Sequence, residues 1–597
     1  MLNIQDVLEK RYPGFFSRSG ILGWPAKILL RMLTHEREMA QFSAEYPKCV
    51  GLDFVDQVLE FFNFSFVVRQ NEKERIPASG RVVIVANHPI GTLDGLALLQ
   101  MVSEIRDDAK VVSTNVLADI PALEPVLLEE PEKKDARHSK AWNAIQNHLE
   151  SEGALIVFPA GSTSRISATG IKDYRWRTLF LRISEETHAP ILPLYIDARN
   201  SLFFYSLSLV SRPLSTLWLV HETFRHAENS VVIRIGEMVE PDALHDLNLP
   251  LKTKAKLMRK QVYRLPKDKP ALFKTLNPLA HPESKHLLKK EIEGCELLGE
   301  TRDGKQIFLY NYASNSSIMR EIGRLREESF RLIGEGTGKR RDVDYYDQYY
   351  LHIILWDQTD LEIVGAYRLC PAHCAAGNSG QNQLYTETLF DYAAGMQEVL
   401  NAGLELGRSF VQPRYWGSRS LDYLWYGIAA YLRRNPQYRY LLGAVSISNS
   451  FSRPAKDLMI RYYQRYYGAE KNLALSKRPY TLDESSKTRI DEMFEGLTAK
   501  EAFVVLKEQL GHMGFSVPTL YKQYTELCKP GGTVFHGFNI DPDFNDCVDG
   551  LVIVDICELS DLKRKRYGLL DHQINTPGDG ATNDLMNPDS LAIHLVK

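Results

Sequence analysis

The chain has 597 residues, a formal net charge of −3 and 44% hydrophobic residues. This length exceeds what one hydrophobic core supports, so we expect two or more domains. The balanced charge and the lack of a strongly basic domain or recognition motif argue against a nucleic-acid-binding protein. Seven cysteines without paired spacing fit a reducing cytoplasm better than a disulfide scaffold, and none is arranged as a metal site.

The first half of the chain alternates between strand and helix patterns. Residues 1–75 are predicted to be helical and amphipathic. Strands are predicted next at 82–86, 154–158, 191–196 and 231–235. Helices are predicted at 94–106, 139–151 and 175–187. This order predicts an α/β domain over residues 76–265, in which helices cover a sheet.

Two stretches of this half favour a membrane surface. Residues 14–33 combine aromatic and aliphatic side chains with three basic residues, and residues 201–220 are apolar except for serines and Arg212. Arg212 and Pro213 interrupt the second run, so it is too broken to span a bilayer. We expect a peripheral contact with the inner face of a membrane, with amphipathic core helices as the alternative.

A histidine and an aspartate follow the first predicted strand. His88 comes directly after the apolar run 82–86, and Pro89 and Gly91 end that strand. A strand that ends in a turn places His88 at the rim of the sheet, with Asp94 a few residues away. A carboxylate that holds a histidine in one tautomer prepares it to deprotonate a hydroxyl group. We therefore predict a general base at His88.

A second block, Phe158-Pro-Ala-Gly-Ser-Thr-Ser-Arg165, also follows an apolar strand. The two blocks together resemble the glycerolipid acyltransferase family, in particular its hemolysin-type branch, which includes lyso-ornithine-lipid O-acyltransferases. Residues 190–196 lie where that family has its fourth block. The chain departs from the family twice: five residues separate His88 and Asp94 instead of four, and Ala160 stands where the family usually has Glu.

This resemblance implies roles for individual residues. His88 would deprotonate the acceptor hydroxyl, and Asp94 would orient His88. The 158–165 turn would bind the polar head of the acceptor, through Gly161 and the amides that follow it, including that of Ser162. Arg165 would bind the acceptor's carboxylate.

A proline-rich passage separates the two halves. Residues 266–290 carry little periodic pattern and are predicted to be a linker, which leaves 291–597 as the second domain. A helix is predicted there at 320–330, a hairpin at 350–356 and 361–369, a strand at 404–411, a helix at 418–434 and a strand at 550–556. We expect a second α/β domain.

Seven side chains of this half agree in type, spacing and order with a known family. They are Arg326, Phe330, Asp344, Asp347, Arg368, Glu405 and Arg408. The set resembles the acyl-homoserine-lactone synthase and ornithine N-acyltransferase branch of the GCN5-related (GNAT) acyltransferases. Residues 385–391 and the pair Leu424-Trp425 also match the ornithine-acylating members of that branch.

Acyl transfer from a thioester to an amine needs a path for the amine's proton and donors for the thioester oxygen. Asp344, Asp347 and Glu405 can hold the charged groups of an amino acid and take up its proton. Arg326, Arg368 and Arg408 can bind a carboxylate or brace those acids. Glu405 either lies nearest the amine, which we expect, or only pairs with Arg408.

Together the two resemblances imply a bifunctional enzyme that forms ornithine lipids. The second domain would transfer a 3-hydroxyacyl group from acyl carrier protein to ornithine, and the first would esterify the resulting lyso-ornithine lipid. Neither step needs a metal or a redox cofactor. The basic clusters 339–341 and 563–566 either dock acyl carrier protein or form a solvated face.

Two alternatives stay open. The amine acceptor can be glutamine, lysine or glycine, since ornithine and lysine differ by a single methylene. Alternatively, the chain joins a lysophosphatidate-type acyltransferase to another acyltransferase, or one half is a non-catalytic scaffold that binds acyl carrier protein or membrane. The two departures from the family pattern make the first half the stronger candidate for that scaffold role.

Overall fold

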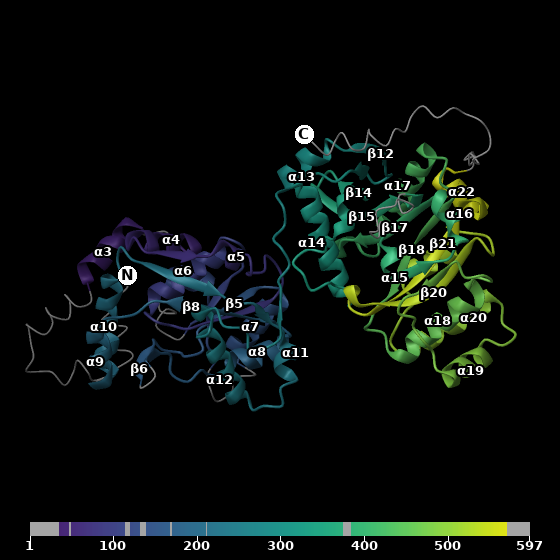
Figure 1. Cartoon of the computed structure of the whole chain (residues 1–597). Helices are drawn as coiled ribbons and strands as arrows, with labels where there is room; N and C mark the ends of the chain where they lie inside the picture. Colours follow the sequence, from purple (N-terminus) through teal and green to yellow (C-terminus); the bar gives the residue numbers. More distant parts are fainter. Residues whose placement is uncertain are drawn as a thin grey trace, which may run out of the picture. The chain divides into compact units, whose positions relative to one another are not determined.

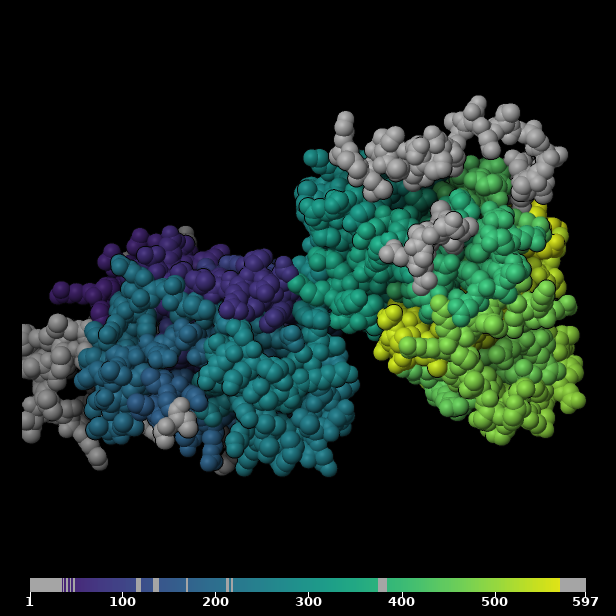
Figure 2. All heavy atoms as spheres, viewed as in Figure 1, coloured from purple at the N-terminus to yellow at the C-terminus, as the bar shows by residue number. Residues whose placement is uncertain are grey.

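The computed structural model describes residues 35–46, 49–113, 120–131, 139–167, 170–210, 212–373 and 384–569. The chain forms two compact units, Met1–His281 and Pro282–Lys597, each of which is closely packed within itself (Figures 1 and 2). The predicted membrane-facing stretch 14–33 lies outside the described residues.

A mixed sheet forms the centre of the first unit. Its described strands are β1 (Ser65–Val68), β2 (Val82–Ala86), β3 (Lys110–Ser113), β4 (Leu127–Glu129), β5 (Ala154–Val157), β8 (Ile191–Asp197), β9 (Ser230–Ile235), β10 (Met238–Val239) and β11 (Thr275–Leu276). The main path runs β1-β9-β8-β2-β5-β3-β4, and β8 to β4 are parallel. The four predicted strands are confirmed. The helical prediction for residues 1–75 is wrong at β1, which pairs with β9.

Helices cover both faces of this sheet (Figure 1). The helices on one face are α4 (Leu52–Phe61) and α6 (Thr92–Ser103), and those on the other are α7 (Lys140–Glu150), α8 (Leu179–Thr187) and α12 (Leu251–Val262). Because strand side chains alternate between faces, Val82 and Ile84 pack in the first core and Val83 and Val85 in the second. A strand buried on both faces is typical of a parallel sheet, and it explains the continuous apolar run of β2.

Parts of the predicted linker belong to the folded units. Within 266–290, β11 pairs with β10 of the first unit, and α13 (Lys285–Ile292) shares a core with α14 (Ser317–Leu332) of the second. The boundary between the two units falls between His281 and Pro282, inside the predicted passage. The low periodicity of this stretch reflects a two-residue strand and isolated turns.

The second unit contains an eight-stranded sheet within its described residues. In spatial order the strands are β12 (Glu296–Glu300), β13 (Gln306–Tyr310), β14 (Leu351–Asp357), β15 (Glu362–Pro371), β17 (Gly403–Val411), β18 (Tyr440–Ile447), β21 (Cys547–Asp555) and β20 (Thr533–Asp541). All neighbours are antiparallel except β17 and β18. Residues Ile354 and Trp356 pack against α13 and α14, whereas Ile353 and Leu355 pack against α17 (Ser420–Arg434). The hairpin, strands and helices predicted for this half are confirmed.

Strand β17 is irregular at the centre of this sheet. Its parallel pairing with β18 covers only Gly403 to Glu405. On its other edge, a register shift leaves Arg408 and Ser409 opposite a single residue of β15, and Arg408 has a φ of 49°. An extra residue of this kind is a β-bulge, which bends the strand and re-aims side chains. The bulge therefore positions Arg408.

Gly443 in β18 lies where strands β17 and β18 approach each other closely. A Cβ atom at Gly443 would lie 2.2 Å from the backbone oxygen of Leu406. We expect Gly443→Ala to lower the free energy of unfolding of this unit by about 1–3 kcal/mol. The control is Gly511→Ala in α20 (Ala499–His512), where the Cβ meets open space and a gain of about 0.5–1 kcal/mol is expected. Calorimetry of the whole chain measures both, and equal effects of the two variants would contradict the prediction.

Candidate functional sites

Asn87 holds the end of strand β2 in place. Its Nδ2 donates to the backbone oxygen of Ile196 (2.9 Å), and the backbone N–H of Ile196 donates to its Oδ1 (2.8 Å). The amide side chain thus continues the pairing with β8 after the regular strand has ended. As a result, His88 emerges from a fixed point at the carboxyl edge of the sheet, where sites of parallel α/β sheets form.

Asp94 lies in the first turn of α6, fully buried. Its Oδ2 accepts the backbone N–H groups of Ile90 (2.9 Å) and Gly91 (3.2 Å), and its Oδ1 lies 3.0 Å from Nδ1 of His88. Gly91 has a φ of 109°, which glycine adopts without strain. The five-residue spacing therefore still brings the two predicted side chains together.

The charge state of His88 follows from this contact. Burial opposes protonation of the imidazole, but the carboxylate of Asp94 outweighs it, so the pKa of His88 is raised above 6.5. The ring also packs against Phe158, with centroids 4.5 Å apart. The His88 side chain is 21% exposed. With Nδ1 beside Asp94, Nε2 is the nitrogen available to a substrate proton.

The second predicted block lies beside His88. The backbone N–H of Ser164 donates to the backbone oxygen of His88 (2.8 Å), which ties the two loops together. Gly161 has a φ of 61°, and Ser162 is exposed. Arg165 donates to Ser215 Oγ (2.9 Å) of α10 (Arg212–Arg225). The structure thus brings Gly161 and Ser162 to the His88 edge, and it ties Arg165 to α10.

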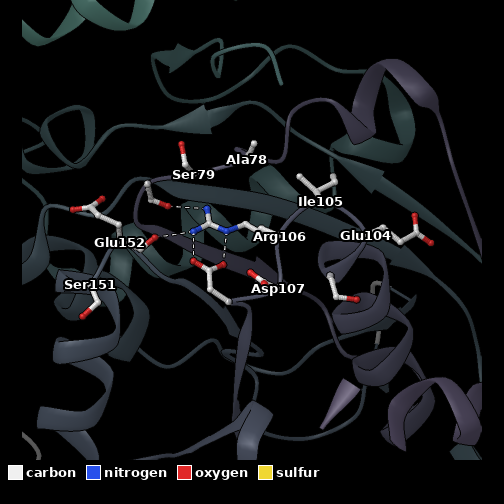
Figure 3. A pocket seen from close by; sticks show the side chains of 11 residues that line it. Ala78, Ser79, Glu104, Ile105, Arg106, Asp107, Ser151 and Glu152 are labelled. Carbon is white, nitrogen blue, oxygen red and sulfur yellow. Dashed lines mark hydrogen bonds and ion pairs between the residues drawn. The ribbon is translucent and has the colours of Figure 1, made fainter. Parts of the chain in front are cut away.

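An open pocket of about 550 Å³ lies elsewhere in the first unit (Figure 3). Its lining includes Gly80 and Glu152, which precede strands β2 and β5, so it lies at the amino ends of these strands. Arg106 at its centre is held by the carboxylate of Asp108 and by the backbone oxygens of Gly80 and Glu152. Since His88 follows the carboxyl end of β2, this pocket is not part of the His88 site.

In the second unit, Arg326 and Arg368 converge on one carboxylate. Arg326 donates to Asp347 Oδ1 (3.0 Å), and Arg368 donates to Asp344 Oδ1 (2.7 Å) and Asp347 Oδ1 (3.1 Å). Asp344 and Asp347 also cap the short helix Tyr345–Gln348 reciprocally. Burial opposes ionisation of Asp347, but the two guanidinium groups prevail and hold its pKa well below its usual range. Both arginines are 1% exposed, so this pairing compensates charges that water does not reach.

Arg408 joins this cluster from the bulge of β17. Its guanidinium lies 3.6 Å from Asp342 and 3.5 Å from Asp344. It also lies over the rings of Tyr385 (5.1 Å) and Phe544 (4.6 Å). Phe330 is buried in the core, and its ring packs against that of Phe544 (5.2 Å). Phe330 therefore supports the aromatic residue under Arg408.

Glu405 is fully engaged with protein groups. Its carboxylate accepts the backbone N–H groups of Tyr385 (3.1 Å) and Thr386 (2.9 Å) and the hydroxyl of Tyr350. Burial raises its pKa. Glu405 does not pair with Arg408, which was the alternative that the sequence left open. Arg408 pairs with Asp342 and Asp344 instead. The catalytic role of Glu405 stays a prediction; its contacts are those of a group that holds the 385–386 turn.

Sequence reasoning missed three carboxyl groups near Arg408. They are Glu335, Asp541 and Asp549. Burial raises the pKa of Glu335 to about 8 and that of Asp549 to about 7. The Tyr385 hydroxyl donates to Asp541, and Asp549 Oδ1 is buried without a hydrogen bond among the described residues. An aspartate inside the apolar strand pattern of β21 was the available signal for Asp549.

The contiguous cluster thus contains more carboxyl groups than arginines. The carboxyl groups are those of Glu335, Asp342, Asp344, Asp347, Glu405, Asp541 and Asp549, and the arginines are Arg326, Arg368 and Arg408. His352, which lies beside them, has a pKa lowered to about 3 by burial and by the two neighbouring arginines, so it adds no positive charge. A cationic ligand beside Glu335 or Asp549, whose pKa values burial raises, would favour their ionised form and be held by it.

Metal sites and membrane-spanning helices are both absent from the described ranges. No group of three or more His, Cys, Asp or Glu side chains there is arranged to hold a metal ion. No described helix is both long and apolar enough to cross a membrane.

Comparison with known proteins assigns each half of the chain. Residues 10–271 match the family described as "Acyltransferase", and residues 325–426 match the "Acetyltransferase (GNAT) domain" family. The chain is similar to the glycine N(alpha)-acyltransferase of Bacteroides thetaiotaomicron, with 30% identity over 49% of this chain and 90% of that protein. It is also similar to the lyso-glycine lipid O-acyltransferase of Phocaeicola vulgatus, with 27% identity over 40% of this chain and 86% of that one.

A third relative is the L-ornithine N(alpha)-acyltransferase of Agrobacterium fabrum, with 33% identity over 18% of this chain and 38% of that protein. The relatives thus include both an N-acyltransferase and a lysolipid O-acyltransferase, as the two halves predict. The chain belongs to the acyltransferases, with an O-acyltransferase-type domain in its first half fused to a GNAT domain of the N(alpha)-acyltransferase type in its second.

Proposed function

We propose that the chain makes a diacylated amino-acid lipid in two steps. The second unit joins a 3-hydroxyacyl group to the α-amine of ornithine, and the first unit esterifies the free hydroxyl of that product. The observation that carries this proposal is the presence in one chain of two different sites: a His–Asp pair that suits a hydroxyl acceptor, and a buried acidic cluster that suits an amine. Their covalent fusion raises the local concentration of the lyso-lipid at its second site.

The esterification step follows from the His88 site. Nε2 of His88 accepts the proton of the lyso-lipid hydroxyl while the hydroxyl oxygen attacks the thioester carbonyl. The carbon–sulfur bond then breaks, and the leaving thiolate takes this proton from His88. Asp94 stabilises the imidazolium that forms. Gly161 and Ser162, in the turn tied to His88, are the groups nearest to receive the polar head. Arg165 would bind its carboxylate from the same turn after leaving Ser215.

The amide-forming step places the amino acid in the acidic cluster of the second unit. Arg408 is the arginine with the longest ion-pair distances, 3.5 and 3.6 Å, so it is the one best able to accept a substrate carboxylate. The α-ammonium group must lose a proton before it attacks. Asp549, whose pKa lies near 7, matches the requirement for a proton acceptor that works near neutral pH.

The acidic cluster bears on which amino acid is the acceptor. The excess of carboxyl groups over arginines supports ornithine, which carries a second ammonium group. Glycine is the second candidate, since relatives with high coverage are named for glycine and for lyso-glycine lipid. Lysine and glutamine are the other acceptors to compare.

The proposed donors are thioesters of acyl carrier protein. Two arginines of the basic clusters already have partners within the chain: Arg341 pairs with Glu283 and Arg566 with Asp422. Lys339 and Lys565 are exposed members of the two clusters. Charge-reversal of these two lysines would lower the rate at low salt if they steer the acidic carrier.

We propose a peripheral contact with the inner face of the cytoplasmic membrane. Large apolar side chains are exposed on α9 (Leu202–Val210) and at the start of α10: Leu202, Phe203, Leu209, Val210 and Leu214. Helix α9 packs beside the strand Arg165–Ser167, which follows the proposed head-group turn. An apolar surface next to this site gives a lipid substrate a short path from the bilayer.

Loss of His88 tests the order of the two steps. In a bacterium that lacks aminolipids, the whole chain should produce a new amine-positive diacyl lipid, and His88→Ala should leave only the mono-acylated form. Mass spectrometry of the lipids identifies both products and the amino acid. The control is His286→Ala, which removes an exposed histidine of α13. Unchanged diacyl lipid in His88→Ala would contradict the role of His88, and mono-acylated lipid alone from the wild-type chain would show that the first unit is a scaffold.

The second prediction concerns pH. Since the pKa of His88 is raised and only the neutral ring accepts a proton, O-acylation should decline on the acid side with an apparent pKa above 6.5. Asp94→Asn should shift this decline to lower pH and reduce kcat by about 100-fold or more. Rates of acyl transfer to purified lyso-lipid, measured from pH 5.5 to 9, give both values. An unshifted acid limb in Asp94→Asn would contradict the pairing.

The third prediction separates the amine acceptors. If the carboxyl groups near Arg408 bind a second ammonium group, Glu335→Gln should raise KM for ornithine by roughly 10- to 100-fold and leave KM for glycine nearly unchanged. Steady-state N-acylation of both amino acids by the whole chain measures the ratio. Glu293→Gln, at an exposed glutamate, is the matched control. Equal effects on the two amino acids would exclude this role for Glu335.

A further inference from the structure

Asp173 is a buried carboxylate of the first unit that the described chemistry does not use. It lies directly after the short strand β7 (Gly170–Lys172), and it is 2% exposed. Its Oδ1 accepts the backbone N–H of His88 (3.2 Å) and the hydroxyl of Ser164 (2.6 Å). Its Oδ2 accepts the indole N–H of Trp176 (2.9 Å). The carboxylate therefore joins its own segment, which includes Trp176, to the segments of His88 and Ser164.

These contacts complete a closed set around His88. Ser164 donates its backbone N–H to His88, and both residues donate to Asp173. Asp173 itself is anchored at its backbone, because its N–H donates to Tyr263 Oη (2.7 Å) and its carbonyl oxygen accepts from Arg259, both of which belong to or follow α12. The loop that carries the base is thus linked to the head-group turn and to the helical layer.

The contacts also explain the departure at Ala160. The family that the chain resembles usually has Glu at this position, whereas Ala160 is buried in the apolar core between the sheet and α7 and α8. The acidic group that touches the head-group turn is instead supplied by Asp173, from another segment.

We propose that Asp173 is a positioning residue for O-acylation: it fixes His88 and the 158–165 turn relative to each other, so that the base faces the bound acceptor. The inference rests on the proposed O-acyltransferase function of the first unit. A carboxylate suits this task because it only accepts hydrogen bonds, and the three groups that contact the Asp173 carboxylate are all donors. An asparagine would turn an N–H group toward one of these donors.

The charge of Asp173 also reaches His88. It raises the pKa of His88 in the same direction as Asp94, while burial raises the pKa of Asp173 itself against the hydrogen bonds from Ser164 and Trp176. The other titratable groups around the pair are Asp94, Tyr195, Tyr263 and Arg259. Loss of the charge at Asp173 should therefore move the acid limb of O-acylation to lower pH.

Kinetics of the whole chain test this role. Asp173→Asn should reduce kcat for O-acylation by up to about 100-fold, with KM for the lyso-lipid changed less than 3-fold, because misplacement of a base affects the reacting geometry more than binding. The acid limb should move to lower pH. In a His88→Ala background, Asp173→Asn should have no further effect, since it acts through His88. N-acylation by the second unit is the control for an intact chain.

Wild-type kcat and pH profile in Asp173→Asn would overturn the proposal, as would an undiminished effect in the His88→Ala background. If Asp173→Asn does not fold, Ser164→Ala and Trp176→Phe each remove one donor and keep the charge. Each should lower kcat several-fold without moving the acid limb, and wild-type kcat in both would also overturn the proposal. Failure of the wild-type chain to O-acylate any lyso-lipid would instead refute the proposed function.

Discussion

In both units, buried carboxylates hold the loops that carry the candidate chemistry. A buried carboxylate is costly unless its oxygens accept hydrogen bonds, and loop N–H groups are equally costly without an acceptor. Asp94 and Asp173 satisfy N–H groups of the 88–91 loop, and Glu405 satisfies those of Tyr385 and Thr386. Each pairing removes two penalties at once. The positions of the sites depend on this constraint.

The two sites differ in how they treat charge. His88 stays partly exposed, with one carboxylate on one ring nitrogen, which leaves the other nitrogen free for a substrate. Arg326 and Arg368 are almost completely buried and are compensated by Asp344 and Asp347. Burial raises the pKa values of Glu335 and Asp549, and the nearby Arg408 only partly offsets this effect. The first arrangement suits proton transfer, and the second suits recognition of a charged amino acid.

Local patterns predicted most of the framework. The apolar run of β2, buried on both faces, and the Pro-Gly turn after it placed His88 at a sheet edge, and the structure confirms that position. The prediction failed where the local signal was weak, as at β1, whose register with β9 depends on a partner more than 160 residues away. The two-residue strand β11 was not predicted either, because so short a segment has no periodicity of its own.

The sequence by itself determined the division into two α/β domains, the His–Asp pair and the order of the polar residues in the second half, because each depends on residues close together in the chain or on a recognisable spacing. Only the tertiary structure decided the partners of the buried charges. Asp173 meets His88 across 85 positions, and Glu405 holds Tyr385 instead of Arg408. Such pairings depend on which donors the packed strands and loops bring within about 3 Å, and spacing along the chain does not encode that distance.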